Sequence, residues 1–198
     1  CISGIYHPTA GHILFRGRNL TGLKSHEIAK IGIARTFQHA ELFSHMTVLQ
    51  NILVGRHTKM SRTLISNGIF WGKTAKEEVV HREQVEKIID FLELQGFRKS
   101  NAAGLPYGIQ KIIGLGRALA MEPQILLLDE PLGQLDAKVR NEIRYEIRKM
   151  AKDLKLTAIH VTHDQSEAMS ISDRIAVMKK GKIVQIGTPQ QLYLNPNS

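Results

Sequence analysis

Cysteine and long apolar runs are scarce in this sequence. Cys1 is the single cysteine among 198 residues, which excludes a disulfide framework and a cysteine-rich zinc site and favours a reducing, intracellular compartment. The sequence has no stretch of about 18 apolar residues, so it predicts no membrane-spanning helix. Aromatic residues make up only 6% of the chain, and lysines and arginines are scattered, which makes a nucleic-acid-binding surface the weakest of the functional interpretations.

The chain does contain enough apolar material for one globular domain, or for one domain with a subdomain. Hydrophobic residues make up 42% of the sequence and charged residues 23%, a composition that argues against disorder. The 27 lysines and arginines exceed the 18 acidic residues and give a formal net charge of +9. This charge suits a nucleotide, a nucleic acid or an anionic membrane surface, and by itself does not choose among them.

Apolar runs of strand length alternate with amphipathic segments of helix length. Residues 33–38, 124–128 and 157–161 are interpreted as buried strands, because short continuous apolar runs are typical of a parallel sheet covered on both faces. Helices are expected over about 108–121 and over 137–154. The alternation predicts an α/β fold with a largely parallel sheet.

The other predicted elements lie outside this alternation. Ser25 is expected to be the N-cap of a helical turn over residues 25–31 that ends at Gly32, and Lys180-Gly181 is expected to turn a hairpin. The pattern further predicts a strand over 12–17, helices over 46–57, 74–95 and 165–169, and strands over 175–178 and 182–186. The apolar side of the helix over 74–95 is expected to carry Val79, Val85, Ile88, Ile89 and Leu92.

Two adjacent carboxylates follow one of the apolar runs. Residues 125–128 would deliver Asp129 and Glu130 to the carboxyl end of a buried strand, which is where ligands bind in open α/β sheets. An aspartate there can hold Mg²⁺ directly or through its waters, and a glutamate can polarise a water for attack on phosphorus. The alternative is that both side chains simply end the strand in solvent.

Polar residues also end the two other predicted strands. His163 follows the strand over 157–161, so we expect it at the same edge as Glu130, where an imidazole can donate a hydrogen bond to an anionic oxygen. Gln38 closes the strand over 33–38. Its amide could orient a water or coordinate a metal, and the alternative is a plain strand cap.

Five motifs then occur in the order and spacing of one family. Arg35-Thr36-Phe37-Gln38 resembles its Q-loop, Leu105-Pro106-Tyr107-Gly108 with Gln110 its signature, Leu126 to Glu130 its Walker B strand, Leu135-Asp136 its D-loop, and Thr162-His163-Asp164 its switch histidine. Together they make nearly the whole chain resemble the ATP-binding subunit of an ABC transporter. The resemblance implies a P-loop NTPase core, RecA-like and ABC-type, formed by residues 1–38 and 116–198. A helical subdomain with the signature would span 39–115.

The resemblance also implies roles for individual residues. Two such subunits sandwich two ATP molecules with Mg²⁺, and each site uses one subunit's Walker motifs and the other's signature. Glu130 would be the general base and His163 the contact to the γ-phosphate, while Asp129 would partner Mg²⁺ and Gln38 would position both metal and water. The residues expected to contact nucleotide are Leu105, Pro106, Tyr107, Gly108, Gln110 and Asp136. A signature at a helix N-terminus offers free N–H groups to a phosphate.

Subfamily features indicate solute import. The Pro-Tyr-Gly form of the signature and the long helical middle resemble importers of branched-chain amino acids, which favours amino-acid import. Residues 131–138 and 163–169 are closer to importers of sugars, polyamines or other osmolytes. The resemblance implies transmembrane permease subunits that dock near residues 39–100, a second ATP-binding subunit, and a peripheral position on the cytoplasmic face of the membrane. It does not identify the solute.

A phosphate-binding loop is the motif that these residues do not contain. ATPases of this class need Gly-x-x-x-x-Gly-Lys-[Ser/Thr], and the nearest candidate, Gly72-Lys73-Thr74, has Asn67 where the first glycine belongs. In the family, the residues at Cys1 match the end of the helix after this loop, so we expect an N-terminally truncated ATPase. The alternative is a non-catalytic subunit that pairs with an active partner. Either way, we expect these residues to bind ATP very weakly and to hydrolyse none.

Overall fold

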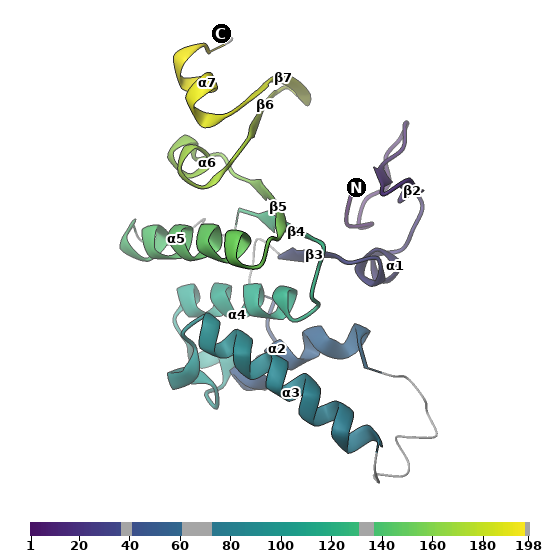
Figure 1. Ribbon diagram of the computed structural model, residues 1–198, viewed down its shortest axis with the longest axis vertical. Coiled ribbons are helices and arrows are strands. Elements are labelled where there is room, and N and C mark those ends of the chain that lie inside the picture. The colour runs from purple at the N-terminus through teal and green to yellow at the C-terminus, as the bar shows by residue number, and fades with distance from the viewer. Residues whose placement is uncertain (37–40, 61–72, 131–136, 197–198) are drawn as a thin grey trace.

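The computed structural model describes residues 1–36, 41–60, 73–130 and 137–196. Its centre is a parallel three-stranded sheet in the order β3 (Ile33–Thr36), β4 (Ile125–Asp129), β5 (Thr157–Val161) (Figure 1). Ile33 pairs with Ile125, which pairs with Thr157, so the three strands begin in register. The predicted α/β fold with a parallel sheet is confirmed.

The middle strand, β4, is covered on both faces. Leu126 and Leu128 are buried against a cluster that includes residues of α4 (Tyr107–Leu119) and α5 (Ala137–Asp153). Ile125 and Leu127 point the other way and pack on a cluster around Leu20, Ile28 and Ile33. Successive side chains of a strand face opposite sides, so only a continuous apolar run suits a strand between two packed layers.

The expectation that β5 is equally buried is wrong. Ile159 is 42% exposed and Val161 55% exposed, while His160 lies half-buried between them. Within the described residues β5 pairs with β4 along one side only. Its apolar sequence therefore lies at the edge of this sheet and not in its middle.

Three helices form a layer beside the sheet, at the end of the molecule drawn lowest in Figure 1. They are α2 (Val48–Val54), continued by the 3-10 helix η1 (Gly55–Thr58), α3 (Lys73–Phe91) and α4. Short 3-10 turns at Gln95–Phe97 and Ala102–Gly104 connect α3 to α4. Their shared core contains the buried side chains of Val48, Ile52, Val85, Ile89, Leu94 and Ile113. The predicted helices over 46–57, 74–95 and 108–121 are confirmed to within a few residues.

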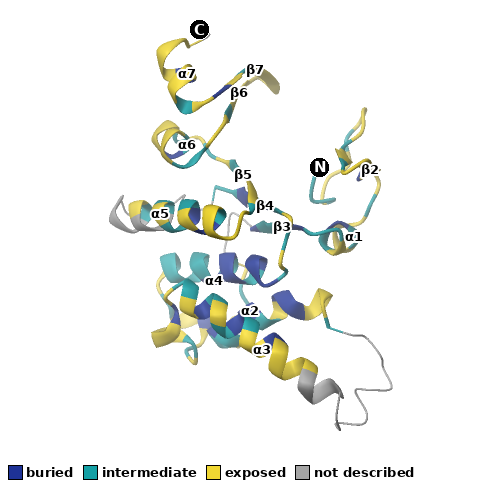
Figure 2. Ribbon diagram, in the orientation of Figure 1, coloured by how far each residue is buried: buried dark blue, intermediate teal, exposed yellow. Residues whose placement is uncertain are grey.

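One face assignment on α3 is wrong. Val79 was expected on the apolar side, yet it is 56% exposed, whereas Val85 and Ile89 are fully buried. Residues 77–80 are exposed (Figure 2) because this part of α3 runs past the region where α2 and α4 pack against it. Val79 precedes Val85 by six residues and therefore lies about a third of a turn away from the strip that carries Val85, Ile88 and Ile89. Helical geometry itself thus places Val79 outside the buried face.

The N-terminal part packs on the opposite face of the sheet. A short hairpin, β1 (Leu14–Phe15) and β2 (Arg18–Asn19), precedes α1 (Ser25–Lys30). The helix begins one residue earlier than expected, because its N-cap is Lys24 and not Ser25. The Glu27 carboxylate accepts the Lys24 backbone N–H at 2.9 Å, so the third residue of the helix satisfies the backbone donor of the N-cap.

The C-terminal part lies at the other end of the molecule (Figure 1). It comprises α6 (Gln165–Ile171), the antiparallel pair β6 (Ile175–Lys179) and β7 (Lys182–Gly187), and α7 (Pro189–Leu194). The hairpin turns at Lys180 and Gly181, both with positive φ, as a two-residue turn requires. The predicted helix over 165–169 and the predicted hairpin are confirmed. Among the described residues, no helix has the length and apolarity needed to cross a bilayer.

Candidate functional site at the carboxyl edge of the sheet

Glu130 stands where β4 leaves the sheet. Its backbone N–H donates to the Val161 carbonyl at 3.0 Å, which ties it to the end of β5. Its φ is +42°, a left-handed conformation that costs a residue with a side chain about 1 kcal/mol or more. Such strained backbone occurs often at functional sites because the surrounding contacts must impose it. The turn directs the Glu130 side chain along the sheet edge and toward the end of β5.

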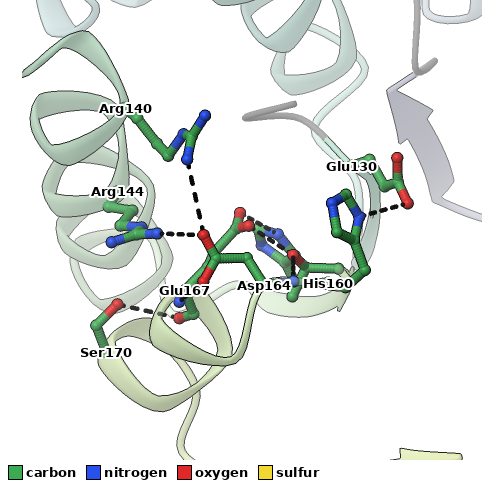
Figure 3. Close-up of polar contacts among 9 residues, drawn as sticks. Glu130, Arg140, Arg144, His160, Asp164, Glu167 and Ser170 are labelled. Carbon is green, nitrogen blue, oxygen red and sulfur yellow. Dashed lines mark hydrogen bonds and ion pairs between the residues drawn. The ribbon is translucent and has the colours of Figure 1, made fainter. Parts of the chain in front are cut away.

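His163 meets Glu130 at this edge. The strands β4 and β5 end side by side, with Asp129 paired to Val161, and His163 follows two residues after β5. The imidazole Nδ1 lies 3.1 Å from Glu130 Oε1 (Figure 3). His163 is 79% exposed and Glu130 30% exposed, so both groups are accessible to a ligand arriving from solvent.

Asp129, the last residue of β4, has a partner that the motifs did not indicate. Arg35 of the adjacent strand β3 binds it, with Nη2 2.6 Å from Asp129 Oδ2. The same guanidinium donates from Nη1 to the Ser3 hydroxyl at 2.9 Å. Arg35 belongs to the Q-loop motif, but only the pairing of β3 with β4 brings it to Asp129, 94 residues later. The arginine lowers the negative charge that this edge presents.

A lysine from the helical layer completes the charge pattern near these carboxylates. Burial lowers the pKa of Lys111 below its ordinary value, and the negative charges of Glu130 and Asp129 partly oppose that shift. Lys111 lines a cavity of about 370 Å³ together with Arg35 and Arg117. Burial likewise lowers the pKa of Arg117, against the influence of Glu41. Three cationic side chains therefore face a cavity with apolar walls next to the end of β3.

The residues predicted to form the signature lie at the start of α4. Pro106 is the N-cap and Tyr107 the first residue of the helix, with Gly108 following it. Gln110 fixes the approach to the helix, because its Nε2 donates to the Leu105 carbonyl at 2.8 Å. This places the predicted signature at a helix N-terminus, as expected, at the positive end of the helix dipole.

Some predicted site residues fall outside the part of the chain that the structure describes. Gln38 and Asp136 are among them, and so is Gly72 of the rejected phosphate-loop candidate. Of the predicted site residues that the structure describes, Glu130, His163 and Asp129 lie at the carboxyl edge of the sheet. In the described ranges, no group of three His, Cys, Asp or Glu side chains is arranged to hold a metal ion.

Comparison with known proteins gives consistent results. The family model described as "ABC transporter" matches residues 1–133. The chain is 42% identical over 197 residues to an Fe(3+) ions import ATP-binding protein of Rhizobium etli, covering 100% of this chain and 51% of that protein. It is 37% identical over 197 residues to a sulfate/thiosulfate import ATP-binding protein of Vibrio vulnificus, covering 100% and 53%. The chain spans about half the length of the curated relatives it matches.

Solved structures agree with the fold. CbiO1 of Clostridium perfringens, part of an ABC transporter complex, matches with a TM-score of 0.80 at 26% identity, over 98% of this chain and 72% of that one. A nucleotide-free ATP-binding cassette from an ABC transporter matches with a TM-score of 0.79 at 26% identity, over 98% and 78%. The curated relatives named above import iron or sulfate and thiosulfate, so they give no support to the expectation of amino-acid import.

Proposed function

Since the chain belongs to the ABC transporter family, we propose that it forms part of the ATP-binding and ATP-hydrolysing subunit of an importer. The observation that carries this proposal is the contact between Glu130 and His163 at the carboxyl edge of the sheet, at 3.1 Å. A carboxylate and an imidazole within hydrogen-bond reach of each other, and open to solvent, are suited to activating a water and contacting a phosphate. The core would comprise residues 1–38 and 116–198, with a helical subdomain over 39–115.

In the proposed mechanism Glu130 is the general base. It accepts a proton from the attacking water, and the 3.1 Å contact to His163 holds its carboxylate at the end of the strand. With Nδ1 donating to Glu130, Nε2 can donate a hydrogen bond to a terminal phosphate oxygen when both ring nitrogens carry a proton. The imidazole thereby links the base to the group under attack.

The donor set at the sheet edge fits Mg²⁺ in part. This ion commonly uses one or two carboxylates and keeps several waters, and Asp129 supplies a carboxylate beside Glu130. Arg35 holds Asp129 Oδ2 at 2.6 Å, so a cation would have to compete with the guanidinium or use the other oxygen. When bound, Mg²⁺ would neutralise charge on the phosphates. Gln38 would be a further ligand and water-positioning group.

Nucleotide binding would also use the signature and the D-loop. The helix start at Leu105, Pro106, Tyr107 and Gly108, with Gln110, would face the γ-phosphate of ATP held by a second ATP-binding subunit. Asp136 would contribute from the D-loop at the same interface. Transmembrane permease subunits would hold the pair at the cytoplasmic face of the membrane. The relatives that import Fe³⁺ or sulfate favour an inorganic solute over an amino acid.

A second candidate follows from one sequence observation. The 198 residues contain no Gly-x-x-x-x-Gly-Lys-[Ser/Thr] segment, the loop whose N–H groups and lysine hold the phosphates. A non-catalytic subunit that presents its signature to an active partner would share every contact described above. Titration calorimetry of this chain with Mg-ATP tests whether these residues hold nucleotide by themselves. We expect no binding in the micromolar range. Micromolar binding would show that these residues hold nucleotide without such a loop.

The decisive test of the proposed function is Glu130→Gln in the intact protein that carries this sequence, assembled with its partners. Removing the base while keeping the shape of the side chain should abolish ATP hydrolysis and preserve the ATP-bound dimer, because the amide accepts no proton. The matched control is Asp153→Asn at the exposed end of α5, which should leave hydrolysis unchanged. Undiminished hydrolysis in Glu130→Gln would remove Glu130 as the base.

A further inference from the structure

His163 is highly exposed, but the residues on both sides of it are firmly held. Before it, the Thr162 hydroxyl donates to Glu167 Oε2 at 2.6 Å. After it, Asp164 is the N-cap of α6, and its Oδ1 accepts the Glu167 backbone N–H at 3.1 Å. Glu167 itself is buried, with 4% exposure, and Oε1 lies 2.7 Å from Nε2 of His160. The first turn of α6 therefore anchors both neighbours of the exposed imidazole.

A second anchor comes from α5. Arg144 Nη2 lies 3.1 Å from Asp164 Oδ2, and Arg140 Nη1 lies 3.8 Å from the same oxygen. The two arginines are four residues apart and so share one face of the helix, and Figure 3 shows both side chains directed at Asp164. The adjacent strip of α5 is fixed in the core by Ile147 and Met150, which are almost completely buried.

The two oxygens of Asp164 are thus fixed from two directions. Oδ1 is held by α6 and Oδ2 by Arg144 of α5, so the carboxylate can rotate in neither direction without breaking a contact. Arg144 is only 15% exposed, and ion pairs shielded from water are weakened less by solvent and salt than surface pairs. The donated Glu167 N–H, together with Arg144, holds the pKa of Asp164 below its ordinary value, so this carboxylate stays charged to a lower pH than an ordinary aspartate.

We propose that Arg144 is a positioning residue, which through Asp164 holds the turn that carries His163 and so keeps the imidazole against Glu130. The inference rests on the proposed function, because it explains how an exposed histidine is aimed at the carboxylate assigned as base. It adds a link between two segments of the chain. The helix that follows the Walker B turn sets the position of the histidine that follows β5.

The experiment measures the His163–Glu130 contact directly, by NMR of the chain labelled with ¹⁵N-histidine. Glu130→Gln should shift the His163 ring nitrogen signals, because it removes the charged acceptor at Nδ1. In a chain that also carries Arg144→Met, we expect this shift to fall to about half or less, since coupled residues respond non-additively. Asp164→Asn should have the same effect. Asparagine keeps an oxygen for the Glu167 N–H, so α6 retains its cap, but it lacks the charge that binds Arg144.

The control is Arg148→Met, one turn further along α5. Arg148 pairs with the exposed Asp173 at 3.7 Å and donates to the Ser170 carbonyl at 3.4 Å, so its loss should leave the Glu130→Gln shift at full size. A full-sized shift in Arg144→Met, or an equal reduction in Arg148→Met, would overturn the proposal. In the intact protein, Arg144→Met should lower kcat and leave KM for ATP unchanged. Undiminished hydrolysis in Glu130→Gln would refute the proposed function, while the NMR result would still decide the role of Arg144.

Discussion

Two glycines in the helical layer should respond to alanine in opposite ways. Gly55 joins α2 to η1, and its φ of −60° and ψ of −24° are ordinary helical values that alanine adopts without strain. Space alone requires glycine there, because a Cβ would lie 2.2 Å from the carbonyl oxygen of Arg117 on α4 and 2.9 Å from the Cβ of Ala120 just after it. Gly114 lies inside α4, and a Cβ there would meet nothing within 4 Å.

The magnitudes follow from these distances. Gly55→Ala forces α2 away from α4, because a backbone carbonyl cannot yield as a flexible side chain can, and overpacking of this kind costs about 1–3 kcal/mol. Gly114→Ala should stabilise the protein by about 0.5–1 kcal/mol, since glycine in a helix interior is that much less favourable than alanine. With a urea slope of about 2 kcal/mol per molar, the midpoint should fall by about 0.5–1.5 M for Gly55→Ala and rise by about 0.3–0.5 M for Gly114→Ala.

Urea unfolding followed by far-UV circular dichroism measures both midpoints under the same conditions. The reasoning would be refuted if Gly55→Ala left the midpoint unchanged, because α2 and α4 would then not approach as closely as described. It would be refuted equally if Gly114→Ala lowered the midpoint, since the space around Gly114 would then be filled. The pair separates a steric requirement from a general intolerance of the helical layer to substitution.

Two further predictions concern polar side chains. Asn51 is fully buried; its amide accepts the Phe43 N–H and donates to the carbonyls of Phe43, Met46 and Thr47. Asn51→Leu leaves these backbone groups without partners, so it should lower the free energy of unfolding, measured in urea, by about 2–4 kcal/mol. A loss below about 0.5 kcal/mol would contradict the buried amide network. For Asp164 the folded pKa lies below the ordinary 3.8, so its stabilisation is complete above that pH and is lost as the pH falls through the folded pKa. The stability difference between wild type and Asp164→Asn should therefore narrow as the pH falls below about 4, and a constant difference in acid unfolding curves would argue against it.

The sequence correctly predicted that Glu130 and His163 lie close together, because parallel strands end at the same edge of a sheet. Glu130 and His163 each follow an apolar run, and that alone indicated their proximity. It did not indicate that Arg35 binds Asp129 or that Arg144 binds Asp164, since these contacts join residues 94 and 20 positions apart. Arginines occur throughout the chain, and only strand pairing and helix packing select these two.

By itself the sequence determined the α/β class, the order of the strands and helices, and the turn at Lys180-Gly181, because these depend on local periodicity and on residues that tolerate particular backbone angles. It also carried the family motifs. Only the tertiary structure decided that β5 lies at the edge while β4 lies in the middle, and that Asp164 is held from two helices. An apolar run has the same local pattern in either position. The burial of a strand and the ion pairs of a side chain depend on which distant segments pack against them. The local pattern does not specify those segments.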